Sequence, residues 1–87
     1  MHEQSLMKDL MRKINSIGEE QQARKITCVK VKLGALSHMS AEHFREHFVL
    51  AAKGSCAENS RLDIEVSKDL NDPHAQDIML DSVEVEN

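Results

Sequence analysis

Residues 25–34 read Lys-Ile-Thr-Cys-Val-Lys-Val-Lys-Leu-Gly, and this stretch decides the fold. From Val29 to Leu33, apolar residues alternate with lysines, so the apolar side chains share one face of a strand and the charges share the other. This alternation is typical of a strand that buries one face only, and Gly34 ends it. Other parts of the chain must therefore cover that apolar face.

The segment before this strand predicts a helix over residues 3–17. Its apolar residues recur at helical spacing and form a stripe made of Leu6, Met7, Leu10, Met11, Ile14 and Ile17. The two methionines are expected to fill the core rather than to bind a soft metal ion. Gly18 ends this helix, or residues 19–23 continue it for a further turn, and the sequence leaves both endings open.

The segment after the strand predicts a second helix from about Ala41 to Lys53. Ser40 is the expected N-cap, and Gly54 stands where a left-handed residue ends a helix. The expected buried stripe consists of Phe44, Phe48 and either Ala51 or Ala52.

Two more strands follow. Residues 61–66 alternate, with Leu62, Ile64 and Val66 facing inward, and residues 67–76 form a turn-rich loop. A last strand over residues 77–86 changes its apolar phase near Asp81 and Ser82, which predicts a bulge there. The chain is thus expected to be a single domain, residues 1–87, of the α+β class. Its order is α-β-α-β-β, with two helices packed on one face of a small, mostly antiparallel three-stranded sheet.

Composition excludes several functions. The 87 residues include no Trp or Tyr and carry a net charge of -4, which argues against a nucleic-acid partner. The longest apolar run, residues 48–52, is too short to cross a membrane. Cys28 and Cys56 form no CxxC pair and suit a reduced, cytoplasmic protein. No catalytic constellation or phosphate-binding loop is present, so the protein is not expected to be an enzyme.

His2 is the most informative of the five histidines because it follows the first residue. The Met1 amine, the backbone nitrogen after it and the His2 imidazole can close small chelate rings on one ion. Such a nitrogen-rich, planar set suits Ni(II) or Cu(II). Glu3 adds an oxygen ligand or holds the imidazole in place. The alternative is a frayed, solvated chain end.

The other four histidines are weaker candidates. His43 and His47 are four residues apart on the predicted second helix, a spacing that can place two imidazoles on one metal ion. The sequence fixes no third ligand for them. His38 lies in the turn before that helix and His74 in the loop 67–76. Each of these two is expected at the surface, unless the fold brings it to a metal site.

Five segments carry a family pattern: Met1-His-Glu-Gln-Ser-Leu6, residues 29–37, residues 44–48, residues 57–65 and residues 77–86. In this order they resemble the hydrogenase nickel-incorporation proteins of the HypA/HybF type. The resemblance implies a nickel metallochaperone for the maturation of nickel-iron hydrogenase, or urease, that binds Ni(II) through Met1, His2 and Glu3. It also implies a GTPase maturation partner and hydrogenase assembly proteins.

The chain departs from the family pattern in two places. The family's zinc domain, held by two CxxC pairs, is replaced by the short loop 67–76 without cysteine, so no zinc is expected. Where some members have an acidic residue, this chain has Ser40, with His38 the nearby substitute. The alternative function is therefore a scaffold for protein interaction without metal delivery. The last strand follows a loop, so a homodimer formed by strand exchange is also compatible with this architecture.

Overall fold

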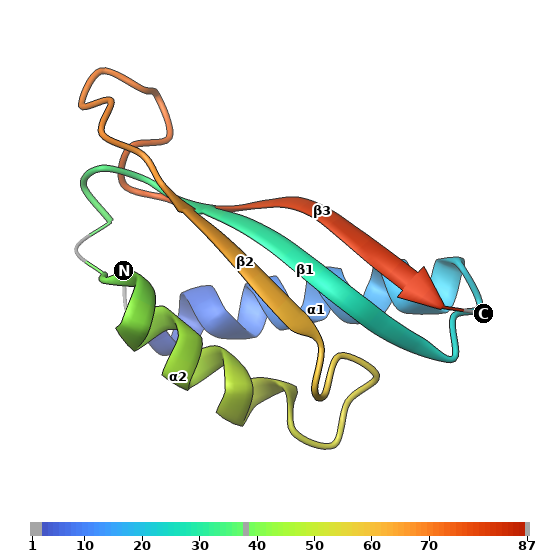
Figure 1. Ribbon diagram of the computed structural model, residues 1–87. Helices are drawn as coiled ribbons and strands as arrows, with labels where there is room; N and C mark the ends of the chain where they lie inside the picture. The colour runs from blue at the N-terminus through green and yellow to red at the C-terminus, as the bar shows by residue number, and fades with distance from the viewer. Residues whose placement is uncertain (1–2, 38, 87) are drawn as a thin grey trace.

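The computed structural model describes residues 3–37 and 39–86 and contains two helices and three strands (Figure 1). Their order along the chain is α1 (Glu3–Glu20), β1 (Lys25–Leu33), α2 (Ala41–Ala52), β2 (Arg61–Val66) and β3 (Ile78–Glu86). The predicted α+β class and the predicted element order are confirmed.

The central strand of the sheet is β1, with β2 on one side and β3 on the other (Figure 1). β1 and β3 are antiparallel, whereas β1 and β2 are parallel. The sheet is therefore mixed, and the expectation of a mostly antiparallel sheet was wrong in this detail. The physical reason is the connection through α2. A helix that crosses over between two strands returns the chain to the end of the sheet at which the first strand began, so the second strand runs parallel to the first.

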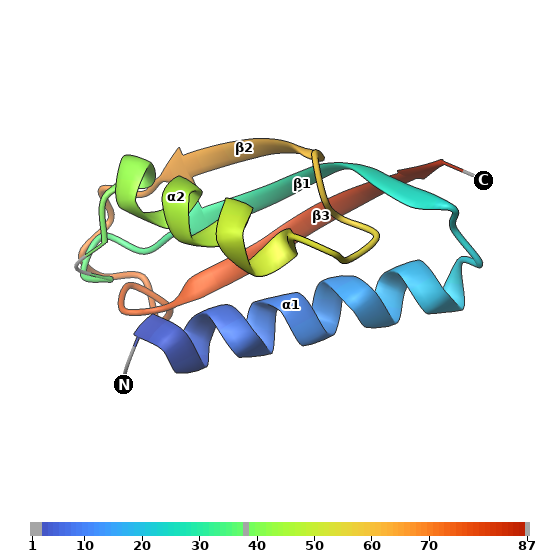
Figure 2. The ribbon, with the colours of Figure 1, turned by 90° about the horizontal axis from the view of Figure 1, so that it is seen from below.

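Both helices pack on one face of the sheet. The core joins the stripe of α1, the aromatic pair of α2 and the alternating face of β1, and its most deeply buried large side chains are Ile14, Ile26, Val29, Val31, Leu33, Phe44 and Phe48. Figure 2 shows α1 running along the length of the long strands. Met7 and Met11 are core residues, as expected.

The end of α1 and both ends of α2 lie at residues that the sequence indicated. α1 passes through Gly18 and ends at Glu20, so the longer of the two predicted endings is the observed one. Ser40 caps α2, and its hydroxyl accepts a hydrogen bond from the backbone nitrogen of His43 at 3.1 Å. Gly54 follows α2 with a φ of 83°, a left-handed conformation that glycine adopts without a Cβ penalty.

The predicted bulge in β3 is confirmed at Asp81. Lys30 pairs with Ser82 and the next residue, Val31, pairs with Leu80, so Asp81 has no opposite residue. The extra residue reverses which side chains face the helices, as the phase change in the sequence indicated. The prediction that Val66 faces inward was wrong. Val66 is 51% exposed, because it is the last residue of the edge strand β2.

The connection from β2 to β3 is anchored to the turn that follows β1. The Gly34 backbone nitrogen donates to the Asp77 carbonyl at 2.9 Å, and that of Leu36 donates to the Ala75 carbonyl at 2.7 Å. Ala75 is buried beneath this turn. A Cβ at Gly34 would overlap the carbonyl group of Ala75 and lie 2.6 Å from the His74 oxygen, so only glycine allows this close approach.

Candidate metal centre

The predicted nickel site falls at the start of α1. Met1 and His2 lie outside the described residues. Glu3 is the first residue of α1, and only its backbone is described. Ligation by these three residues stays a prediction.

A groove of about 280 Å³ lies beside the first turns of α1. Its walls come from α1, from the end of the loop and from the start of β3, and are formed by Leu6, Asp9, Leu10, Lys13, His74, Asp77, Ile78, Met79 and Leu80. Leu6 is three residues after Glu3, which at a rise of about 1.5 Å per residue is less than one helical turn. The groove therefore begins within one helical turn of Glu3, the first residue of α1.

His74 is held in this groove by three hydrogen bonds. Its Nδ1 lies 3.1 Å from Oδ2 of Asp77, and its backbone nitrogen donates to Oδ1 of Asp72 at 2.9 Å. The Asp77 backbone nitrogen donates to the His74 carbonyl at 2.9 Å. Sequence reasoning placed His74 in the loop but missed its pairing with Asp77. The His-x-x-Asp spacing after Pro73 is the one signal that could have found it.

His43 and His47 meet on α2, as their spacing indicated. Their ring centroids are 4.5 Å apart with an interplanar angle of 40°. Across residues 3–37 and 39–86, no three His, Cys, Asp or Glu side chains are arranged to hold a metal ion. Within that part of the chain the pair therefore belongs to no three-residue metal site, and His38 lies outside the described residues.

The two thiols contact oxygen atoms of neighbouring side chains. The Cys28 thiol donates to Oδ2 of Asp63 at 3.7 Å, and the Cys56 thiol donates to Oδ1 of Asn15 at 3.9 Å. Burial raises the pKa of the Cys28 thiol, and the carboxylates of Asp63 and Glu84 raise it further. Because the thiolate is the reactive form, Cys28 is a poor nucleophile and a poor metal ligand.

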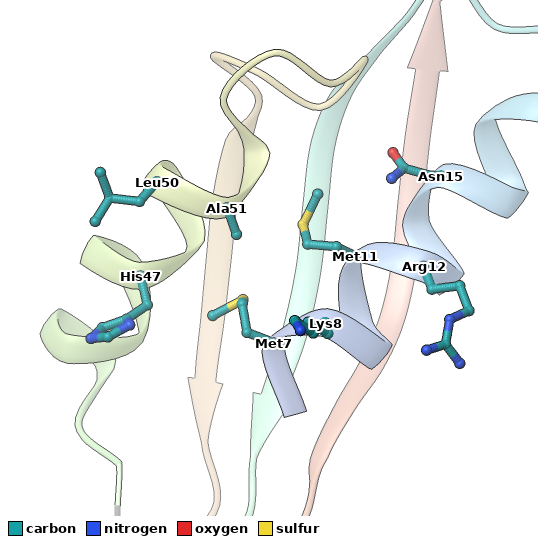
Figure 3. A pocket seen from close by; sticks show the side chains of 8 residues that line it. All are labelled: Met7, Lys8, Met11, Arg12, Asn15, His47, Leu50 and Ala51. Carbon is teal, nitrogen blue, oxygen red and sulfur yellow. The ribbon is translucent and has the colours of Figure 1, made fainter. Parts of the chain in front are cut away.

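A second, larger groove of about 560 Å³ lies between α1 and α2 (Figure 3). It is lined by Met7, Lys8, Met11, Arg12, Asn15, His47, Leu50 and Ala51. In Figure 3, Met7 extends from α1 toward α2, whereas Leu50 points away from α1. Leu50 is 70% exposed, and its neighbour Val49 is 62% exposed. Four of the eight lining residues are apolar and four are polar or charged, and His47 is the one His, Cys, Asp or Glu residue among these eight, so the groove is a mixed surface rather than a set of metal ligands.

Comparison with known proteins identifies the family. The model described as hydrogenase/urease nickel incorporation, metallochaperone, hypA matches residues 1–70. A hydrogenase maturation factor HypA from Archaeoglobus fulgidus is 35% identical over 68 residues, which is 78% of this chain and 62% of that protein. The corresponding factor from Methylocella silvestris is 32% identical over 66 residues, covering 76% of this chain and 58% of that protein. The chain thus matches about 60% of the length of these relatives.

The solution structure of the Ni metallochaperone HypA from Helicobacter pylori shares the fold, with a TM-score of 0.80 and 22% sequence identity. The match covers 99% of this chain and 98% of that chain, so it includes β3, which lies beyond the family-model match. In the described part of the chain, no helix is long and apolar enough to cross a membrane. The chain belongs to the HypA family of hydrogenase and urease nickel-incorporation metallochaperones.

Proposed function

We propose that the protein is a nickel metallochaperone for the maturation of nickel-iron hydrogenase or urease. Met1 and His2 supply nitrogen ligands to Ni(II), and Glu3 supports them. The observation that carries this proposal is that the family match begins at residue 1 and so includes all three residues.

The start of α1 has a rigid base and surroundings of mixed charge. α1 is packed against the sheet along its apolar stripe, which gives the chain end a rigid base. The adjacent groove carries two carboxylates, Asp9 and Asp77, against one lysine, Lys13. Asp9 is partly offset by Arg12, whose guanidinium lies 3.3 Å away. The formal charges of Asp9 and Asp77 are thus balanced by those of Lys13 and Arg12, so the charge of the groove by itself does not select a cation.

A nickel titration by calorimetry tests the proposal. The protein must begin at an untagged Met1, confirmed by mass spectrometry, because the amine is a ligand. We expect one tight Ni(II) site in the unmodified chain and loss of that site in His2→Ala, since the chelate rings need the imidazole. Equal nickel affinity in the two proteins would contradict the proposal.

Four further expectations belong to the same proposal. The domain works without zinc, since residues 67–76 contain no cysteine and both thiols contact oxygen atoms. The protein has no catalytic role, because its family delivers a metal ion. Its cytoplasmic location and a homodimer stay predictions from the sequence. The anchoring of the loop 67–77 to the turn 34–36 restrains the strand exchange that such a dimer needs.

The groove between α1 and α2 favours a role in protein interaction beside metal binding. We propose that the GTPase maturation partner, or a hydrogenase assembly protein, contacts the exposed apolar rim that Leu50, which lines this groove, forms on α2 with its neighbour Val49. Leu50→Glu places a charge on that rim and is expected to weaken partner binding at least about tenfold, while nickel affinity stays unchanged. Surface plasmon resonance against the GTPase measures the first effect and calorimetry the second. Unchanged partner affinity would place the contact elsewhere.

A further inference from the structure

We propose that His43 and His47 on α2 form a second, weaker metal site for a divalent ion that prefers tetragonal coordination, Ni(II) or Cu(II). Imidazole is a favoured ligand of both ions. Both histidines belong to the described residues, and the site does not depend on the proposed N-terminal ligands. It gives a chemical role to a pair of side chains that the proposed function does not use.

The two imidazole rings lean toward each other. Residues four apart on a helix hold their Cβ atoms about 5–6 Å apart, whereas the ring centroids of His43 and His47 are 4.5 Å apart. At a metal–nitrogen distance of about 2.0–2.1 Å, the value for zinc, two imidazoles on one ion hold their ring centres about 4.5–5 Å apart, with the shorter separation for nitrogens at a right angle. The observed separation therefore suits two neighbouring positions of a tetragonal ion. The interplanar angle of 40° shows that the rings are not stacked flat on each other.

The helix fixes the backbone positions of both histidines. Phe44 and Phe48, the residues that follow them, are buried in the core with their rings 6.2 Å apart. The Ser40 hydroxyl accepts from the His43 backbone nitrogen at 3.1 Å, so the first histidine lies on a capped turn. Because α2 is ordered without an ion, chelation costs the conformational entropy of two side chains only.

Both rings are accessible from solvent. His43 is exposed, and His47 is half-buried beside the groove between α1 and α2 (Figure 3). Within residues 3–37 and 39–86, no third His, Cys, Asp or Glu side chain joins the pair. Water therefore supplies the remaining ligands, as it does at the open position of catalytic metal sites. With two protein donors, the site is weaker than the proposed N-terminal set of three nitrogen atoms.

The charges around the pair are mixed. Glu42 and Glu46 are exposed on the same helix. Lys8 and Arg12 line the groove beside His47 from α1. These formal charges offset one another, so chelation by two imidazoles, and not the local charge, holds the ion. A chelate binds more tightly than two separate imidazoles, because its second ligand binds within the same molecule.

The test uses the full chain in a His2→Ala background, so that the proposed N-terminal site does not mask a weaker one. Inorganic Ni(II) is the probe, and calorimetry measures its affinity. His43→Gln and His47→Gln are each expected to lower the affinity of the remaining site at least about tenfold. The double variant is expected to bind about as weakly as either single variant, because the chelate is lost once one ring is removed.

The matched control keeps the number of histidines and changes their spacing. His47→Gln combined with Val49→His places the second imidazole six residues after His43, on a different face of α2. Val49 is 62% exposed, so the change does not disturb the core. The affinity is expected to stay as low as in His47→Gln. Proton NMR gives a second readout, since the first additions of paramagnetic Ni(II) are expected to broaden the ring signals of His43 and His47 together.

The outcomes separate this inference from the proposed function. Unchanged affinity in the two single variants would overturn the site, and so would absence of nickel binding in the His2→Ala chain. Recovered affinity in the respaced variant would show that separate imidazoles bind the ion, which overturns the chelate. The proposed function is judged instead by the tight site of the unmodified chain.

The variants are expected to keep the fold. Neither histidine belongs to the core cluster, and Gln is a good helix former. Circular dichroism checks this for each variant before the titration.

Discussion

Gly34→Ala is expected to destabilise the protein by about 3 kcal/mol and to detach the loop 67–77 from the turn after β1. The added Cβ would overlap the backbone of Ala75 and lie 2.6 Å from the His74 carbonyl oxygen. Backbone atoms cannot move aside as the end of a long side chain can, so the loop itself must shift. The hydrogen bonds from Gly34 and Leu36 to the loop would then weaken.

Thermal unfolding and hydrogen exchange measure the two parts of this effect. A loss of about 3 kcal/mol corresponds to a fall in Tm of roughly 12–24 °C for a domain of this size. The amide of Leu36, which donates to Ala75 at 2.7 Å, is expected to exchange faster in the variant.

Gly54→Ala is the matched control for Gly34→Ala. Gly54 has a φ of 83° and no neighbouring atom within 4 Å of a Cβ built on it. Its replacement therefore carries only the backbone cost of a left-handed residue, about 1–2 kcal/mol, and the Leu36 amide should stay protected. If both variants lost the same stability and kept that protection, close packing at Gly34 would not explain the loop anchor.

Local sequence signals predicted the fold well where one residue decides the outcome. Ser40 caps α2 through its hydroxyl, and the phase change near Asp81 corresponds to an unpaired residue in β3. The direction of β2 relative to β1 was not predictable in the same way. Strand direction depends on how α2 crosses the sheet, which is a property of the whole chain rather than of any short pattern.

The candidate site was predictable only in part. The proposed chelating set at residues 1–3 is a prediction from its position in the sequence, since its atoms are neighbours in the chain. The pairing of His74 with Asp77 is also local, but its relation to α1 is not. Leu6 and His74 are far apart in the sequence, and they meet at one groove only because β3 returns beside the helix. A contact of this kind depends on the tertiary fold.

Phe44→Ala is expected to have the largest effect on stability, a loss of about 4 kcal/mol. Phe44 is fully buried, and its ring lies 6.2 Å from that of Phe48, the other large side chain that α2 contributes to the core. Phe44 and Phe48 are the only Phe, Tyr or Trp residues in the sequence. The remaining core side chains are smaller, so they fill only part of the cavity that loss of the Phe44 ring leaves. The loss is comparable to the whole stability expected for a chain of this length, about 4–13 kcal/mol.

Urea denaturation followed by circular dichroism measures this loss, with Leu50→Ala as the matched control on the same helix. Leu50 is 70% exposed, so its truncation is expected to change stability by less than about 0.5 kcal/mol. A small effect of Phe44→Ala would mean that α2 is held mainly by its cap and by the hydrogen bond at 3.1 Å from Arg45 to the Leu62 carbonyl. The expected large effect would instead show that burial of Phe44 fixes α2 on the sheet, and with it the groove that α2 forms with α1.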